Sequence, residues 1–144
     1  MKTINQKLQN LVKMGLLATV ILSFAACSEE SDPLSPELTN VSGKWDGTII
    51  HPGYDSGTLT LQILQSNDNL SGSFTMKLVK NNNVQNYGGT IIGAKISSNN
   101  YNLSLINSNF TWICDLNLNS TTLSGDWESS DNYGISGSLS VQKD

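Results

Sequence analysis

The sequence from residue 41 onward predicts an all-β domain, an eight-stranded antiparallel up-and-down barrel. Apolar and polar residues alternate with a period of two along this region, which is typical of half-buried strands. Clusters of Asn, Asp, Ser and Gly, which favour turns, separate the alternating runs. Tight connections make consecutive strands pair antiparallel, and closing such a meander buries its one apolar face. An open two-layer β-sandwich of the same strands is the alternative.

The expected strands follow this alternation in chain order. They lie at residues 43–50, 58–63, 70–78, 87–96, 101–105, 110–118, 123–127 and 135–141. The clearest is FTWICDLNL, which places five apolar residues on one face: Phe110, Trp112, Cys114, Leu116 and Leu118. The register of 87–96 stays open, because either Ile91 or Ile92 can face inward.

The same parity gives an inward face to each remaining strand. These faces are, in order, Gly43, Trp45, Gly47 and Ile49; Leu59, Leu61 and Ile63; Leu70, Gly72, Phe74, Met76 and Leu78; Tyr101, Leu103 and Leu105; Leu123, Gly125 and Trp127; Ile135, Gly137, Leu139 and Val141. Turns are expected between the strands, at residues 51–57, 66–69, 80–86, 97–100, 107–109, 119–121 and 129–132.

One short phrase occurs four times, as VSGKW, LSGSF, LSGDW and ISGSL. In each copy an apolar residue, a Gly and a large apolar residue share one parity, so the glycine is predicted to face the interior. Inward glycines relieve crowding where barrel strands coil most sharply. The phrase is therefore interpreted as part of the barrel wall rather than as a ligand-contacting motif.

The first 26 residues have the pattern of a secretory signal. Three lysines precede a thirteen-residue apolar run, 14–26, which is too short to span a membrane. Residues 27–39 combine four acids with two prolines, a composition typical of a flexible tether. The folded domain is therefore expected at residues 40–144.

The stretch FAAC at the end of the signal resembles the lipobox of bacterial lipoproteins, with Phe24 where Leu is usual. The resemblance implies that Cys27 is acylated and becomes the first residue of the mature chain. The following SEESDP resembles an acidic tag that sends lipoproteins to the outer face of a Gram-negative outer membrane. We therefore expect a surface-exposed protein that is anchored in the outer membrane through lipid on Cys27.

Charge and composition exclude several classes of function. The chain has no Arg, and all twelve acids but only five of the eight lysines lie beyond the expected signal, so nucleic-acid binding is not expected. With one His, His51, and one further cysteine, Cys114, a zinc site lacks ligands and no disulfide framework exists. The sequence predicts no cofactor, no metal and no catalytic activity; a hydrolase built on His51 or on outward-facing acids is a disfavoured alternative.

Over residues 41–141 the pattern resembles the small meander barrels of the lipocalin and avidin type. VSGKWDG is similar to the first strand of avidins, and TTLSGDW to a phrase in their seventh strand. The departures are at the biotin-contacting positions, where this chain has Gly47, Phe74, Met76 and Leu123. The resemblance therefore implies the barrel architecture without a biotin site.

Aromatic residues are the candidate ligand-binding set. An eight-stranded barrel can be filled by its own side chains or can hold one small ligand. The function expected from the sequence is a non-catalytic binding or interaction module, with a small apolar ligand, a glycan or an envelope protein as partner. The residues proposed for contact are Trp45, Tyr54, Trp112, Trp127 and Tyr133.

Overall fold

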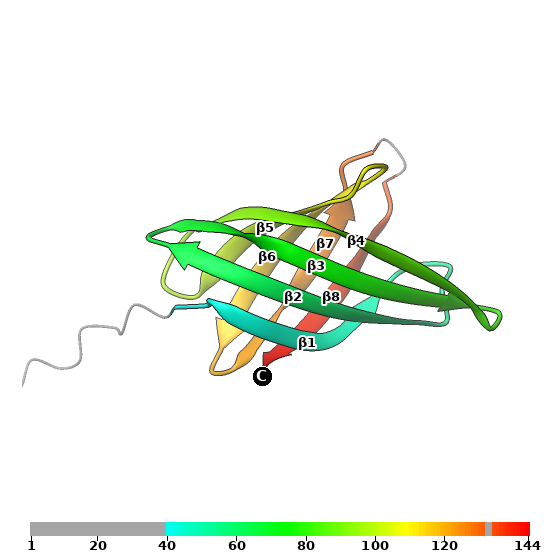
Figure 1. Cartoon of the computed structure of the whole chain (residues 1–144), viewed down its shortest axis with the longest axis horizontal. Helices are drawn as coiled ribbons and strands as arrows, with labels where there is room; N and C mark the ends of the chain where they lie inside the picture. The colour runs from blue at the N-terminus through cyan, green and yellow to red at the C-terminus, as the bar shows by residue number, and fades with distance from the viewer. Residues whose placement is uncertain (1–39, 132–133) are drawn as a thin grey trace, which may run out of the picture. The chain divides into compact units, whose positions relative to one another are not determined.

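The computed structural model describes residues 40–131 and 134–144, and within them it contains eight strands (Figure 1). The strands are β1 (Gly43–Ile50), β2 (Ser56–Ser66), β3 (Asn69–Lys80), β4 (Asn83–Lys95), β5 (Asn100–Ile106), β6 (Thr111–Asn119), β7 (Thr122–Ser129) and β8 (Ser136–Lys143). The expected signal, Cys27 and the tether lie outside the described residues, as does Tyr133. No helix in the described ranges is long and apolar enough to cross a bilayer.

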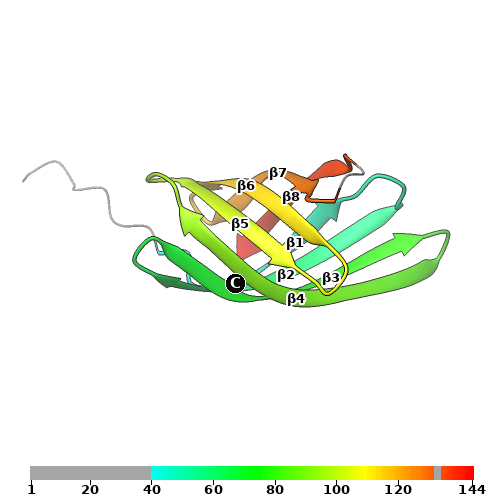
Figure 2. The same ribbon diagram turned by 90° about the horizontal axis from the view of Figure 1, so that it is seen from above.

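The strands form a closed antiparallel barrel in sequential order (Figures 1 and 2). Each strand pairs with the next, and β8 returns to pair with β1, for example Gly47 with Val141. The predicted up-and-down barrel is confirmed, and the sandwich alternative is wrong. Closure gives every strand a neighbour on both sides, whereas an open sandwich of these strands would leave edge strands. Residues 83–89 of β4 extend past β5 and pair with β3 alone.

The barrel interior is filled by one cluster of buried apolar side chains drawn from every strand. Their positions follow the predicted two-residue alternation. The open question in β4 is resolved, because Ile91 is 1% exposed and Ile92 is 60% exposed. Register explains this result: Ile91 pairs with Gly72 and Leu105, which belong to the inward rows of β3 and β5.

The glycines of the repeated phrase lie in the inward rows, as predicted. A Cβ on Gly137 would stand 2.1 Å from the Ile50 carbonyl oxygen and 2.8 Å from the Trp127 ring. Gly72 has a φ of +151°, and a Cβ there would stand 1.9 Å from the Gln62 carbonyl oxygen. These positions allow neighbouring main chains and one indole ring to approach more closely than any side chain would permit.

Two predictions about the element boundaries are wrong. Residues 80–86 were expected to form a turn, but the turn is only Asn81 and Asn82, and β4 begins at Asn83. Both asparagines have positive φ, 49° and 61°, a conformation that Asn tolerates well. The β3–β4 hairpin therefore extends past the ends of its neighbours (Figures 1 and 2).

The second correction concerns strand starts. Phe110 and Ile135 were expected on inward faces, but each precedes its strand and is more than a third exposed. Main-chain bonds at the barrel rim explain this, since the amide of Asn107 donates to the carbonyl of Phe110 and closes the turn before β6. Both side chains therefore lie at the rim rather than in the core.

The meander gives the barrel two distinct ends. The connections β1–β2, β3–β4, β5–β6 and β7–β8 lie at one end, named here the open end. Asn40, the C-terminus and the connections β2–β3, β4–β5 and β6–β7 lie at the other, named here the closed end. The chain therefore enters and leaves the barrel at the closed end.

Candidate functional site

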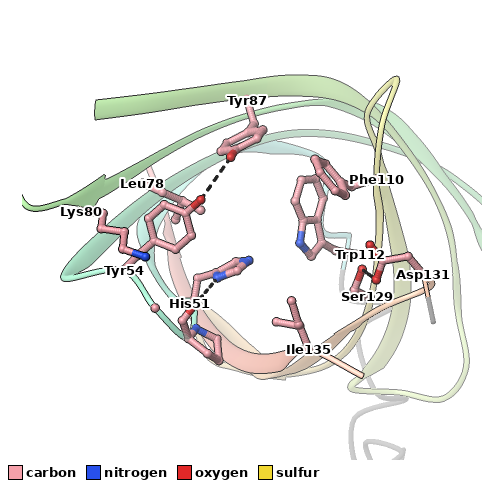
Figure 3. Close-up of a pocket in the computed structure, with 12 residues that line it drawn as sticks. His51, Tyr54, Leu78, Lys80, Tyr87, Phe110, Trp112, Ser129, Asp131 and Ile135 are labelled. Carbon is pink, nitrogen blue, oxygen red and sulfur yellow. Dashed lines mark hydrogen bonds between the residues drawn. The ribbon is translucent and has the colours of Figure 1, made fainter. Parts of the chain in front are cut away.

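A cavity of about 250 Å³ lies at the open end of the barrel (Figure 3). All four connections or strand ends at this end contribute to it. Of the buried core residues described, only Leu78 and Trp112 border the cavity, so it occupies the mouth of the barrel and not its length. The lining residues are His51, Pro52, Gly53, Tyr54, Leu78, Lys80, Tyr87, Phe110, Trp112, Ser129, Asp131 and Ile135.

An aromatic cluster forms one side of this cavity. The ring centroids of Tyr87 and Trp112 are 5.9 Å apart with an interplanar angle of 79°, and Phe110 lies 5.8 Å from Trp112. Beneath them, Phe74 meets Trp112 edge-to-face at 6.0 Å. These arrangements are favourable for aromatic quadrupoles and hold the rings in place. They arise because β4 and β6 each turn an aromatic residue inward close to the open end.

The opposite side is built from the β1–β2 loop. His51 stacks at 4.9 Å on Trp127 and meets Tyr54 edge-to-face at 4.9 Å. The Trp127 indole donates to the Ile50 carbonyl at 3.2 Å, and the His51 Nδ1 bonds to the Pro52 carbonyl at 2.9 Å. These contacts fix the loop against the barrel wall, so the His51 and Tyr54 rings have defined positions beside the cavity (Figure 3).

Polar groups bridge the two sides at the rim. The hydroxyls of Tyr54 and Tyr87 both donate to Gln85 Oε1, each at 2.6 Å, and lie 3.4 Å from one another. Burial, and then the Tyr54 hydroxyl, raise the pKa of Tyr87 to about 12. Ser129 Oγ donates to Asp131 Oδ1 at 2.5 Å. Lys80 is exposed and adds a cation to the rim.

The candidate residues predicted from the sequence are distributed over both ends. Tyr54 and Trp112 line the cavity, and Trp127 packs behind His51 without lining it. Trp45 lies towards the closed end, fully buried, with its indole donating to the Val41 carbonyl at 2.8 Å. Tyr133 lies outside the described residues.

Sequence reasoning did not select His51, Tyr87, Phe110 and Asp131 as cavity residues. A signal for them exists, because alternate connections of a meander meet at one end. His51, Phe110 and Asp131 lie in the first, third and fourth connections at the open end, and Tyr87 lies on the long β3–β4 hairpin. Grouping the aromatic residues by connection rather than by strand would have brought them together.

Among the described residues, little supports a nucleophilic or metal-binding site. Cys114 is 0% exposed, does not line the cavity, and burial raises the pKa of its thiol to about 12. His51 is at the open end and faces aromatic rings. No group of three or more His, Cys, Asp or Glu side chains capable of holding a metal ion occurs in the described ranges.

Comparison with protein-family models found no match, and comparison with curated proteins found none either. Among solved structures, the chain is similar to a redesigned β-barrel, with 15% identity and a TM-score of 0.54 over 72% of this chain and 90% of that one. It is also similar to a de novo designed fluorescence-activating β-barrel, with 15% identity and a TM-score of 0.55 over 77% of this chain and all of that one. At this identity the likeness shows the barrel fold.

Proposed function

We propose that this protein is a non-catalytic, lipid-anchored binding module that takes a small, largely apolar ligand in the open-end cavity. The observation that carries the proposal is the cavity itself, where the rings of His51, Tyr54, Tyr87, Phe110 and Trp112 surround one space (Figure 3). Concave, mostly aromatic sites with a few convergent polar groups are the usual form of small-molecule sites.

The volume of the cavity limits the size of the ligand. An apolar cavity of roughly 150 Å³ holds benzene, and sites for drug-sized molecules start at roughly 300 Å³. The cavity here, at about 250 Å³, lies between these values. It therefore suits a ligand of one or two rings, or an aliphatic body of equal size, rather than a long acyl chain.

The affinity expected for such a ligand is modest. Small ligands gain at most about 1.5 kcal/mol per non-hydrogen atom, and the value falls steeply as ligands grow. For a two-ring compound of about 12 non-hydrogen atoms, about 0.5 kcal/mol per atom corresponds to a dissociation constant on the order of tens of micromolar. The Tyr54–Gln85–Tyr87 network and the His51–Trp127 stack preorganise the site, which reduces the entropic cost of binding.

Titration by ¹H–¹⁵N nuclear magnetic resonance, with the neutral two-ring alcohol 2-naphthalenemethanol as probe, tests the proposal. We expect saturable shifts of the amides of Tyr54, Tyr87 and Trp112, with Val41 and Leu118 at the closed end unaffected. Phe110→Ala removes an exposed ring from the cavity lip and should weaken binding several-fold. Its matched control, Ile92→Ala, removes an exposed side chain from the outer wall and should change nothing. Absence of saturation, or shifts spread over both ends, overturns the proposed function.

The anchoring part of the proposal has separate support. FAAC ends an apolar run in the manner of a lipobox, and Cys27 would then carry the lipid. Asn40 enters the barrel at the end opposite the cavity. Tethered from that end to an outer membrane, the barrel would present its cavity away from the bilayer.

Metabolic labelling with an alkyne analogue of palmitate tests the anchor. The wild-type chain should incorporate label and fractionate with membranes, whereas Cys27→Ser should do neither. Cys114→Ser serves as the matched control and should behave as wild type, because the Cys114 side chain is fully buried. Label on Cys27→Ser, or unlabelled wild type in the membrane fraction, contradicts lipid anchoring through Cys27.

A further inference from the structure

We propose that the open-end cavity selects ligands with a positively charged, hydrogen-bond-donating group, that is, an organic ammonium on a small apolar body. This inference rests on the proposed function and specifies the chemistry of the same site. It follows from four lining residues, because their hydrogen bonds within the protein leave acceptor atoms facing the cavity: His51, Tyr54, Tyr87 and Asp131.

The two tyrosines present oxygen lone pairs rather than protons. Each phenol has one proton, and both protons are directed to the same acceptor, Gln85 Oε1, at 2.6 Å. The separation of 3.4 Å between the Tyr54 and Tyr87 oxygens allows only a weak bond between them. The phenol oxygens beside the cavity are therefore available to accept a hydrogen bond from a ligand.

His51 presents an acceptor as well. Its Nδ1 lies 2.9 Å from the Pro52 carbonyl oxygen. A carbonyl can only accept, so Nδ1 carries the proton, and in the neutral ring Nε2 then has a free lone pair. Figure 3 shows the imidazole directed into the cavity, with its second nitrogen on the cavity side.

Asp131 adds a negative charge at the same rim. Ser129 Oγ donates to Asp131 Oδ1 and uses one of about four lone-pair positions that a carboxylate offers. Aromatic faces within about 6 Å add a further attraction for a cation. Trp112 and Phe110 lie on the same side of the cavity as Asp131 (Figure 3).

Lys80 is the lining residue that opposes a cation, and its position decides where the ligand's charge lies. Figure 3 shows Lys80 and Asp131 on opposite sides of the cavity. Lys80 ends β3 and is exposed, so its ammonium can extend into water on a flexible stem. The ligand's ammonium is therefore placed beside Asp131. The barrel as a whole, with five lysines and eight carboxylates in residues 40–144, also attracts cations.

Three probes with one ring system test the inference. We compare 2-naphthylmethylammonium, 2-naphthalenemethanol and 2-naphthoate by isothermal titration calorimetry at low ionic strength. The expected order of affinity is ammonium, alcohol, carboxylate, with about tenfold between the first two. Equal binding of all three, or tightest binding of 2-naphthoate, overturns this inference and leaves the proposed function standing. No binding of any probe overturns both.

Variants that remove one negative charge test which carboxylate causes the preference for ammonium over alcohol. Asp131→Asn should abolish the preference for ammonium over alcohol, and Asp131→Glu, which keeps the charge, should retain it. The matched control is Asp126→Asn, which removes the same charge from an exposed position on β7. Loss of the preference in Asp126→Asn as well would show a general field effect and overturn the assignment to Asp131. An unchanged preference in Asp131→Asn overturns it directly.

Discussion

The two ends of the barrel differ in how their inward-facing side chains are covered. At each end a tryptophan indole donates to a main-chain carbonyl, Trp45 to Val41 and Trp127 to Ile50. At the closed end the bond holds the entering chain over the core, and Val41 is 1% exposed. At the open end it holds the β1–β2 loop, and a cavity of about 250 Å³ remains.

The difference lies in what covers the last layer of inward side chains. At the closed end, the amide of Val41 donates to the side-chain oxygen of Gln65, in β2, at 2.9 Å. The amide of Gln65 in turn donates to Ser42 Oγ at 2.8 Å, so the entering segment is fastened to β2. At the open end, Tyr87 and Phe110 lie beyond the core and surround a space. The same two-residue alternation therefore builds a closed end that is covered by the entering chain and an open end that has a cavity.

The largest expected effect tests this contrast directly. Trp45→Ala removes a fully buried ring from the sealed end and should reduce the free energy of unfolding by about 3–5 kcal/mol. Trp112→Ala should cost roughly half as much, because one side of that ring already borders a cavity. Urea unfolding of both variants measures the difference. Equal losses would mean that the open end is as tightly packed as the closed end.

A glycine substitution at the open end should have the next largest effect. A Cβ on Gly137 would collide with the Ile50 carbonyl and the Trp127 ring, so Gly137→Ala should destabilise the fold by about 1–3 kcal/mol. At Gly88 the nearest atom to an added Cβ is 3.4 Å away, so Gly88→Ala should be close to neutral. Urea midpoints of the two variants provide the comparison. A neutral Gly137→Ala would show that the loop holding His51 is not fixed against β8.

The alkaline pH dependence of stability should carry a contribution from the open-end phenols. The pKa of Tyr87 is raised to about 12, against about 10 in the unfolded chain, so folding favours the protonated phenol. This contribution is complete below pH ~10 and is lost as the pH rises towards ~12. Unfolding midpoints at pH 9 and 11 should therefore fall more steeply for wild type than for Tyr87→Phe. Parallel pH profiles would show that Tyr87 does not contribute to the loss of stability at alkaline pH.

The smallest effect is expected on the outer surface of the closed end. Lys44 pairs with Asp46 and Asp144 on the barrel surface, and hydrogen bonds to Asp144 and then Asp46 raise its pKa to about 12. Exposed ion pairs contribute little because water and salt screen them. Lys44→Gln should shift the urea midpoint only slightly, and 0.5 M NaCl should abolish that shift. A large, salt-insensitive loss of stability would show that this ion-pair cluster helps to keep Trp45 covered.

Much of the barrel could be predicted because its information is local. The alternation in FTWICDLNL fixes which residues of β6 face inward, whatever strands lie beside it. The boundaries of β4 could not be predicted, since Asn83–Asn86 look like a turn and become strand only by pairing with β3. Polar residues of this kind have no strong strand preference, so the partner strand decides their conformation.

The candidate site was only partly accessible to the same reasoning. Tyr54 and Trp112 were selected as aromatic residues, and they line the cavity. Trp45 was also selected as an aromatic residue, but it lies buried towards the closed end, because it stands near the start of β1. His51 was visible as the only histidine, yet nothing in the chain shows that it would stack on Trp127.

By itself, the sequence determined the inside and outside of every strand except β4, the number of strands and their antiparallel order. These properties depend on a two-residue period and on short connections, which are local. The tertiary structure decided that β8 meets β1, which end is sealed, and that Tyr54, Tyr87 and Asp131 surround one cavity. These depend on register and on contacts between residues far apart in the chain, which no local pattern encodes.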